Sequence, residues 1–185
     1  MILRQIIKED IPVIFEWLRD IGTMRYMLTY LPYSIGTLAS PEDEDLEHDE
    51  INAYGANHIF GVGAKDSGKL IGTMGLYDIQ ERDGRAYTRT LLGDRSYHQG
   101  GYGIDAKMHL LKYAFDTVGL RKICANVHGT HAISYMYNNT CGFEVEAVLK
   151  EHSVVGNKLT DWLCMRITRE MWEPKWREYQ QNGHI

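Results

Sequence analysis

One segment of the chain combines glycines with polar residues at a spacing that suits anion binding. Residues 98–103 read His-Gln-Gly-Gly-Tyr-Gly, between a strand-like stretch and a helix-like stretch. A strand that enters a helix through glycines brings backbone N–H groups and the positive helix end to one point, which suits phosphate. Gly101 and Gly103 also carry no Cβ that would hold an anion away from the backbone. The segment predicts a phosphate-binding turn, and a turn with a purely structural role is the alternative.

Two other phosphate-binding loops do not match this segment. A mononucleotide P-loop requires Gly-Lys followed by serine or threonine, whereas Ile104-Asp105-Ala106 follows here. A dinucleotide fingerprint follows the first strand of a βαβ unit, whereas this turn follows several strands that we expect to be antiparallel. Neither loop explains the turn.

The elements that position the turn are predicted from the period of the apolar residues. Strands are expected where β-branched and aromatic residues lie between turn residues, at residues 2–7, 57–64, 69–79, 85–93, 121–127, 143–151 and 159–168. Helices are expected where apolar residues recur every three or four positions, after Asp10 and at residues 23–28, 40–54, 104–118, 132–140 and 170–180. Short links make neighbouring strands antiparallel, and the helix after the turn makes one parallel crossover. The predicted fold is α/β (α+β): a mixed, mostly antiparallel sheet of six or seven strands flanked by helices.

Composition narrows the class of protein. The chain has 185 residues, 44% of them hydrophobic and 24% charged, which predicts a single globular domain over residues 1–185. A net charge of -5 predicts no nucleic-acid partner. We expect no membrane partner and a cytoplasmic location, because the sequence shows neither a secretory signal nor a run of about 20 apolar residues. Cys124, Cys141 and Cys164 are expected to be free thiols, and no metal site is expected.

In this order, the motifs resemble the GNAT superfamily of N-acetyltransferases. The turn at residues 98–103 is similar to the family signature Gln/Arg-x-x-Gly-x-Gly/Ala, with histidine in the first place. Further resemblances lie at residues 4–10, 68–72, 91–93 and 120–123, and at Ser134 with Cys141-Gly142-Phe143. The last of these, together with Trp17-Leu18-Arg19-Asp20, is most similar to the ribosomal-protein-alanine N-acetyltransferase branch.

The resemblance implies the GNAT acyl-CoA N-acyltransferase fold, with acetyl-CoA as co-substrate in a V-shaped opening between the fourth and fifth strands. The pantetheine arm would lie along Leu91, Leu92 and Gly93, with a backbone N–H near Leu92 as the oxyanion donor. The remaining cofactor-binding residues implied are His98, Gln99, Gly100, Gly101, Tyr102, Gly103, His131 and Asn138. His131 stands where the family usually has asparagine, and Asn138 where many members have tyrosine. Tyr137 lies one residue earlier, which leaves a tyrosine general acid in question.

Transfer of an acyl group from a thioester to an amine requires that the amine lose a proton and that the departing thiolate gain one. By resemblance, Ser134 is the candidate acid, and Glu151 and His152, which are expected to close the sixth strand, are the candidate bases. A serine bonded to its own helix and two exposed polar residues are the alternatives. His128 and His131, which follow the fifth strand, rank behind these bases, and the alternatives for them are contact with the cofactor or a structural role.

The acceptor is less well defined by the sequence. The acidic residues between 42 and 50 would attract a cationic amine, although a solvated helix start explains them equally. Four residues would either line the acceptor site or belong to the core: Tyr26, Met27, Tyr30 and Tyr33. We expect an N-acetyltransferase that acts on a primary amine, either a small molecule or a peptide, and a homodimer is possible. The alternatives are a non-catalytic acyl-CoA-binding module and a fold without a CoA site.

Overall fold

The computed structural model describes residues 1–24, 26 and 57–183. The helix predicted at residues 40–54, the acidic residues between 42 and 50, and Met27, Tyr30 and Tyr33 lie outside the described residues. None of the described helices is both long and apolar enough to cross a lipid bilayer.

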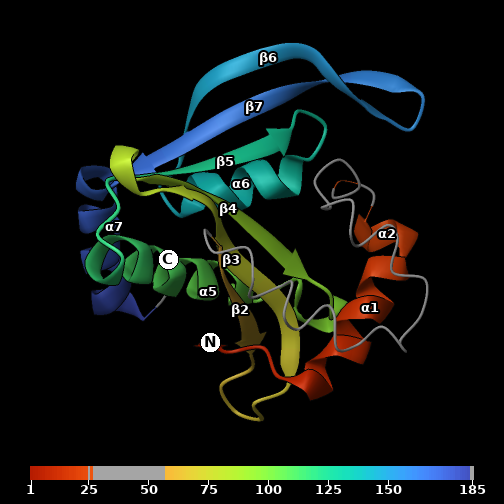
Figure 1. Ribbon diagram of the computed structural model, residues 1–185, viewed down its shortest axis with the longest axis vertical. Coiled ribbons are helices and arrows are strands. Elements are labelled where there is room, and N and C mark those ends of the chain that lie inside the picture. The colour runs from red at the N-terminus through yellow and green to blue at the C-terminus, as the bar shows by residue number, and fades with distance from the viewer. Residues whose placement is uncertain (25, 27–56, 184–185) are drawn as a thin grey trace.

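Among the described residues, seven strands form one sheet in the order β1-β2-β3-β4-β5-β7-β6 (Figure 1). Every neighbouring pair is antiparallel except β4 and β5, which are parallel. The predicted mixed, mostly antiparallel sheet is therefore confirmed. The strands are β1 Ile2–Arg4, β2 His58–Gly63, β3 Leu70–Gln80, β4 Arg85–Leu92, β5 Lys122–His128, β6 Glu144–Val155 and β7 Lys158–Thr168.

The helices flank this sheet. The α-helices are α1 Ile11–Arg19, α2 Ile21–Met24, α5 Tyr102–Lys112, α6 Ala132–Thr140 and α7 Arg169–Asn182. A turn of π-helix, Tyr113–Thr117, extends α5, and short 3₁₀ turns lie at Lys8–Asp10, Glu81–Asp83 and Arg95–Tyr97. Contacts of α5 with α6 and α7 place these three helices together (Figure 1).

Several predicted bounds needed correction. The first strand ends at Arg4 rather than at residue 7, because a 3₁₀ turn follows. Asp10 precedes α1 as predicted, but its carboxylate binds Arg4 and the Ile7 N–H instead of capping the helix. The described part of the second helix is Ile21–Met24, earlier than predicted. Pro174 lies inside a continuous α7.

The sixth strand was also predicted too short. β6 continues past residue 151 to Val155, and its pairing with β7 is irregular between Leu149 and Ser153. Glu151 lies in this irregularity with φ of 49°, a conformation that is uncommon for residues other than glycine. Glu151 and His152 therefore lie within a long hairpin and do not close a strand. The hairpin extends beyond the end of β5 (Figure 1).

The main core lies between the central strands and α5. It contains Met74 of β3, Ile123 of β5 and Leu111 of α5, all fully buried. A second, smaller cluster joins α1 to the sheet through Ile11, Phe15 and Leu70 and their neighbours. Free cysteines were expected, and Cys124, Cys141 and Cys164 are free.

Candidate active site

The parallel strands β4 and β5 are paired over a short stretch only. Arg85 pairs with Lys122, and the last pair is Tyr87 with Cys124. Beyond it the strands diverge toward their C-terminal ends (Figure 1). The rest of β4 keeps its pairing with β3 and loses β5 as a neighbour. The result is a V-shaped opening in which this edge of β4 has no strand partner among the described residues.

The direction of the backbone N–H group differs among the three residues that we expect along the pantetheine arm, which are Leu91, Leu92 and Gly93. The Gly93 N–H donates to the Ile71 carbonyl of β3. Because successive residues of a strand direct their N–H groups to opposite sides, the Leu92 N–H points toward the opening. Leu92 therefore remains a candidate donor to the ligand, whereas the N–H of Gly93 is used within the sheet. Leu91 is buried.

The glycine-rich turn lies where β4 passes into α5. Gly100 and Gly101 have φ of 83° and 78°, a conformation that favours glycine because it has no Cβ. Gly101 is the N-cap of α5, and no side chain in the described part of the chain caps the helix. A Cβ placed on Gly101 would have no heavy atom of residues 1–24, 26 or 57–183 within 4 Å. The first N–H groups of α5 are thus accessible to an anion.

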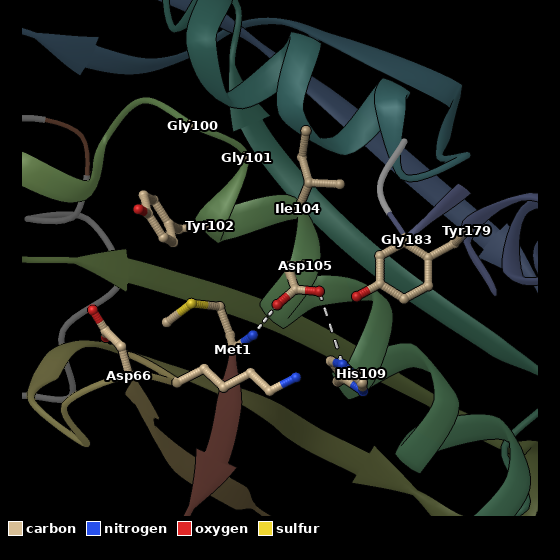
Figure 2. Close-up of a pocket in the computed structure, with 11 residues that line it drawn as sticks. Met1, Asp66, Gly100, Gly101, Tyr102, Ile104, Asp105, His109, Tyr179 and Gly183 are labelled. Carbon is tan, nitrogen blue, oxygen red and sulfur yellow. Dashed lines mark hydrogen bonds and ion pairs between the residues drawn. The ribbon is translucent and has the colours of Figure 1, made fainter. Parts of the chain in front are cut away.

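A cleft of about 470 Å³ opens beside this turn (Figure 2). Gly100, Gly101 and Tyr102 form one side of it, and Lys65 and His109 also line it. Asp105, in the first turn of α5, makes an ion pair with the Met1 amino group. The cleft therefore extends from the exposed backbone of the turn to the side chains of Lys65 and His109.

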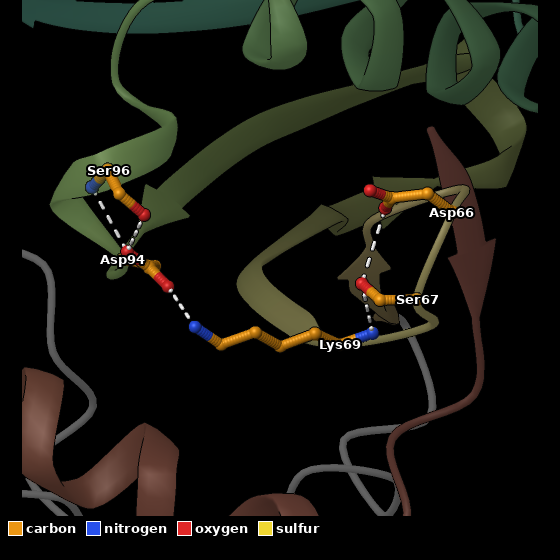
Figure 3. A network of polar contacts seen from close by, with 5 residues as sticks. All are labelled: Asp66, Ser67, Lys69, Asp94 and Ser96. Carbon is orange, nitrogen blue, oxygen red and sulfur yellow. Dashed lines mark hydrogen bonds and ion pairs between the residues drawn. The ribbon is translucent and has the colours of Figure 1, made fainter.

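The side chains around the turn hold it against the sheet. The His98 Nε2 lies 2.7 Å from the Leu92 carbonyl oxygen. Asp94 accepts hydrogen bonds from the N–H and hydroxyl of Ser96 and makes an ion pair with Lys69 at 2.7 Å (Figure 3). The Lys69 and Ser96 hydrogen bonds lower the pKa of the Asp94 carboxyl to about 2, so it stays ionised near neutral pH. The contact of His98 with the Leu92 carbonyl is structural, and its predicted role in cofactor binding stays a prediction.

The start of α6 carries the next group of predicted residues. The His131 ring stacks on Tyr26, with centroids 4.0 Å apart. Asn138 is only 4% exposed and donates to the Ser134 carbonyl at 2.9 Å and, more weakly, to its hydroxyl at 3.4 Å. Its Oδ1 is buried, with no hydrogen-bond partner among the described residues. Ser134 and Asn138 thus form one unit, one turn apart on α6.

The two predicted bases lie apart from this unit, on the β6–β7 hairpin. Both are exposed. The Glu151 N–H donates to Asp161, and the His152 ring lies edge-on to Trp162 with centroids 4.5 Å apart. Trp162 in turn contacts His128, at the end of β5, at 5.8 Å. His152 is connected to the end of β5 through Trp162, and whether Glu151 or His152 acts as a base stays a prediction.

A cluster of rings therefore lies where β5 ends. We call Tyr26, His128, His131 and Trp162 the ring cluster. The Trp162 N–H donates to the Ser153 hydroxyl, which lies 3.0 Å from His128 Nδ1. Burial lowers the pKa of the His128 imidazole, against a hydrogen bond with the Tyr26 backbone that raises it. His128 is consequently neutral near pH 7 and able to accept a proton.

Sequence reasoning missed two hydroxyls and a lysine at the narrow end of the V. Lys107 of α5 is 1% exposed, and its Nζ donates to Thr88 Oγ1 at 3.0 Å. Two residues along β4, Thr90 is joined to the Tyr137 hydroxyl at 3.2 Å. We call these four residues the apex cluster. The spacing of the sequence does indicate that Lys107 is buried. Lys107 lies four residues after Gly103 and four before Leu111, on the buried side of the helix.

This arrangement matches a known family of proteins. A family model described as "Acetyltransferase (GNAT) domain" matches residues 1–144. The chain belongs to the GNAT acetyltransferase family. It is therefore an acetyltransferase, as the resemblance implied. "Uncharacterized N-acetyltransferase p20" from Bacillus licheniformis is 25% identical over 159 residues, which cover 86% of this chain and 87% of the relative.

Solved structures support the fold of this GNAT member. The spermidine N-acetyltransferase from Vibrio cholerae, in complex with CoA and spermine, has a TM-score of 0.79 at 22% identity, covering 92% of this chain and 96% of the other. A chimera of that enzyme with hSSAT has a TM-score of 0.78 at 19% identity, covering 93% and 99%. That this chain belongs to the ribosomal-protein-alanine N-acetyltransferase branch of the family stays a prediction.

Proposed function

We propose that this GNAT domain, over residues 1–185, transfers the acetyl group of acetyl-CoA to a primary amine by direct attack in a ternary complex. The observation that carries the proposal is the free edge of β4, which leads into the uncapped N-terminus of α5. That geometry offers an extended chain a strand edge and offers a phosphate a helix end.

The residues of the site fit acetyl-CoA in two respects. Gly100 and Gly101 present backbone to solvent with no side chain above Gly101, which suits the pyrophosphate. The buried Asn138 Oδ1 has no hydrogen-bond partner among the described residues, and an amide N–H of the pantetheine arm would supply one. His98, Gln99, Tyr102, Gly103 and His131 are the other proposed cofactor contacts, with Leu91, Leu92 and Gly93 along β4.

The proposed chemistry assigns a task to each end of the V. The Leu92 N–H would stabilise the oxyanion of the tetrahedral intermediate. A hydroxyl on α6, from Ser134 or Tyr137, would protonate the departing sulfur. The neutral His128, or Glu151 and His152 through water, would take the proton of the amine.

The ring cluster supports one class of acceptor. Aromatic faces attract ammonium groups, and Tyr26 and Trp162 lie beside the neutral His128 at the end of β5. The similar structure that contains spermine is consistent with a small cationic amine. We therefore propose polyamines as the first class to test, ahead of aminoglycosides, amino sugars and peptide N-termini.

The test is release of free thiol from acetyl-CoA in the presence of a panel of these four amine classes. Saturable, amine-dependent release confirms the proposal, and the best amine identifies the acceptor class. CoA binding by calorimetry without release for any amine contradicts it and favours a non-catalytic acyl-CoA-binding module.

Replacing Gly101 with alanine is expected to weaken CoA binding by about tenfold or more, because a methyl group would occupy the approach to the α5 N-terminus. Gly156→Ala is a matched control, since Gly156 also has a positive φ, of 64°, and open space around it, but lies in the β6–β7 turn. Both substitutions should cost about 1 kcal/mol of folding stability. Equal CoA affinities of the two variants, measured by calorimetry, would contradict the proposed pyrophosphate site.

Replacing Ser134 with alanine distinguishes the two candidate acids. If Ser134 protonates the sulfur, kcat should fall by about 10²-fold while the KM for acetyl-CoA changes little. The Tyr137→Phe variant is measured beside it by the same thiol-release assay. Turnover unchanged in Ser134→Ala removes Ser134 from the mechanism.

A further inference from the structure

The apex cluster contains a buried positive charge that the proposed mechanism has not used. The Lys107 Nζ makes one hydrogen bond, to Thr88, and lies 5.2 Å from the centroid of the Tyr137 ring and 5.7 Å from that of Phe143. No carboxylate among the described residues forms an ion pair with Lys107. A buried ammonium without a counter-ion is costly, and an apolar side chain of similar size would avoid that cost.

The buried charge of Lys107 lies near the point where β4 and β5 separate. Thr88 directly follows Tyr87, the last residue of β4 that pairs with β5. Thr90, on the same face of β4, holds the Tyr137 hydroxyl. The lysine of α5 and the tyrosine of α6 are therefore fixed to the two β4 residues at which the V begins. A positive charge at this point is complementary to an anion that forms during the reaction.

We propose that Lys107 is a positioning residue for acyl transfer, which acts through Tyr137 and Thr88 to stabilise negative charge on the departing sulfur. This inference rests on the proposed function, with Tyr137 rather than Ser134 as the acid. The amine nitrogen forms a bond to the carbonyl carbon, the C–S bond breaks, and its electron pair moves to sulfur. The Tyr137 hydroxyl gives its proton to the sulfur, and the proton that the base takes from the amine returns to the tyrosine through water. Lys107 transfers no proton and stabilises both the thiolate and the phenolate.

The surroundings make the charge of Lys107 observable. The titratable groups that face it are Tyr137 of α6 and Cys141, the residue that directly follows α6, while β4 contributes only the uncharged Thr88. Burial raises the pKa of Tyr137 well above 10 and that of Cys141 to about 12. Burial also lowers the pKa of Lys107 to about 8, with Cys141 opposing the shift. Within the cluster, only Lys107 changes charge between neutral pH and about pH 10.

The experiment compares wild type with Lys107→Met, with the best amine from the panel. The expected result near pH 7 is a kcat lower by about tenfold or more, with a KM for acetyl-CoA within about twofold. The ratio of the two kcat values should fall toward one as the pH rises past about 8, because the wild-type lysine then loses its charge. Lys112→Met is the control, since Lys112 lies on the same helix, is exposed and pairs with Asp116.

Three outcomes are distinguishable. A Lys107→Met variant with wild-type kcat overturns the inference and leaves the proposed function intact. So does a kcat ratio that stays constant over this pH range, because it indicates an effect of packing. Wild type that releases no thiol with any amine overturns the proposed function and this inference with it.

Discussion

Lys107→Met is expected to stabilise the folded protein at neutral pH and to lose that effect in alkali. Burial lowers the pKa of this lysine from 10.5 to about 8. Between these values the unfolded chain binds more protons than the folded one, so the stability of the wild type rises with pH over this window. Below about pH 8 the full cost of the buried charge is present, and above about pH 10.5 it is gone. The free-energy advantage of the variant should therefore be larger at pH 7 than at pH 10.5 by about 3 kcal/mol.

Urea unfolding at both pH values measures this difference. The Lys107→Met variant also loses the hydrogen bond from Lys107 to Thr88, at either pH. This loss reduces the free-energy advantage of the variant at both pH values and leaves the pH dependence of that advantage unchanged. The double variant Lys107→Met with Thr88→Val removes this offset, because neither partner is left unpaired. An advantage that is equal at both pH values would show that the lysine is not buried as a cation. A more stable and less active variant would indicate that the chain retains this charge for its chemistry.

Gly93→Ala is expected to destabilise the fold by about 2–3 kcal/mol through overpacking. A Cβ on Gly93 would lie 1.8 Å from Cδ2 of the Trp17 ring and within 2.3 Å of two further ring atoms. Trp17 belongs to α1, so the clash would push α1 and the end of β4 apart. Because Gly93 follows Leu92 directly, the same displacement should weaken CoA binding.

A double-mutant cycle isolates the contact. In a Trp17→Ala background, Gly93→Ala should cost less than about 1 kcal/mol, a coupling of about 2 kcal/mol. Gly63→Ala is the matched control, since Gly63 also lies at the end of a strand but its Cβ would meet its nearest atom at 3.5 Å, an ordinary contact. Equal unfolding free energies for Gly93→Ala and Gly63→Ala would contradict the close packing of Trp17 on the strand end.

The fold and the cofactor turn could be predicted because their signals are local. The glycines at residues 100–103 and the apolar stripe of α5 are read within a few turns of chain. The bounds of α6 were predicted correctly, since Gly142, with φ of 96°, ends that helix. The true length of β6 was not predictable, because the left-handed residue in it is Glu151, and a glutamate gives no sign of such a conformation.

The apex cluster could not be predicted for a different reason. Its hydrogen bonds join residues 19 and 47 positions apart, and no local pattern specifies which strand a helix will face. The departure at position 138 showed that the usual tyrosine was missing, and the structure shows that the hydroxyl of the neighbouring Tyr137 contacts β4 instead. Likewise, the packing of Trp17 on Gly93 depends on how α1 lies against the sheet.

The irregular pairing in β6 also affects how the chain behaves in concentrated solution. β6 is one of the two outer strands of the described sheet, and an outer strand presents unpaired N–H and C=O groups on which a strand of another chain can build. Its register shifts twice, once near Val145 and once between Leu149 and Ser153. An incoming strand would therefore find alignment over short stretches only. We therefore expect the irregular register to oppose the growth of fibres from the open edge of the hairpin.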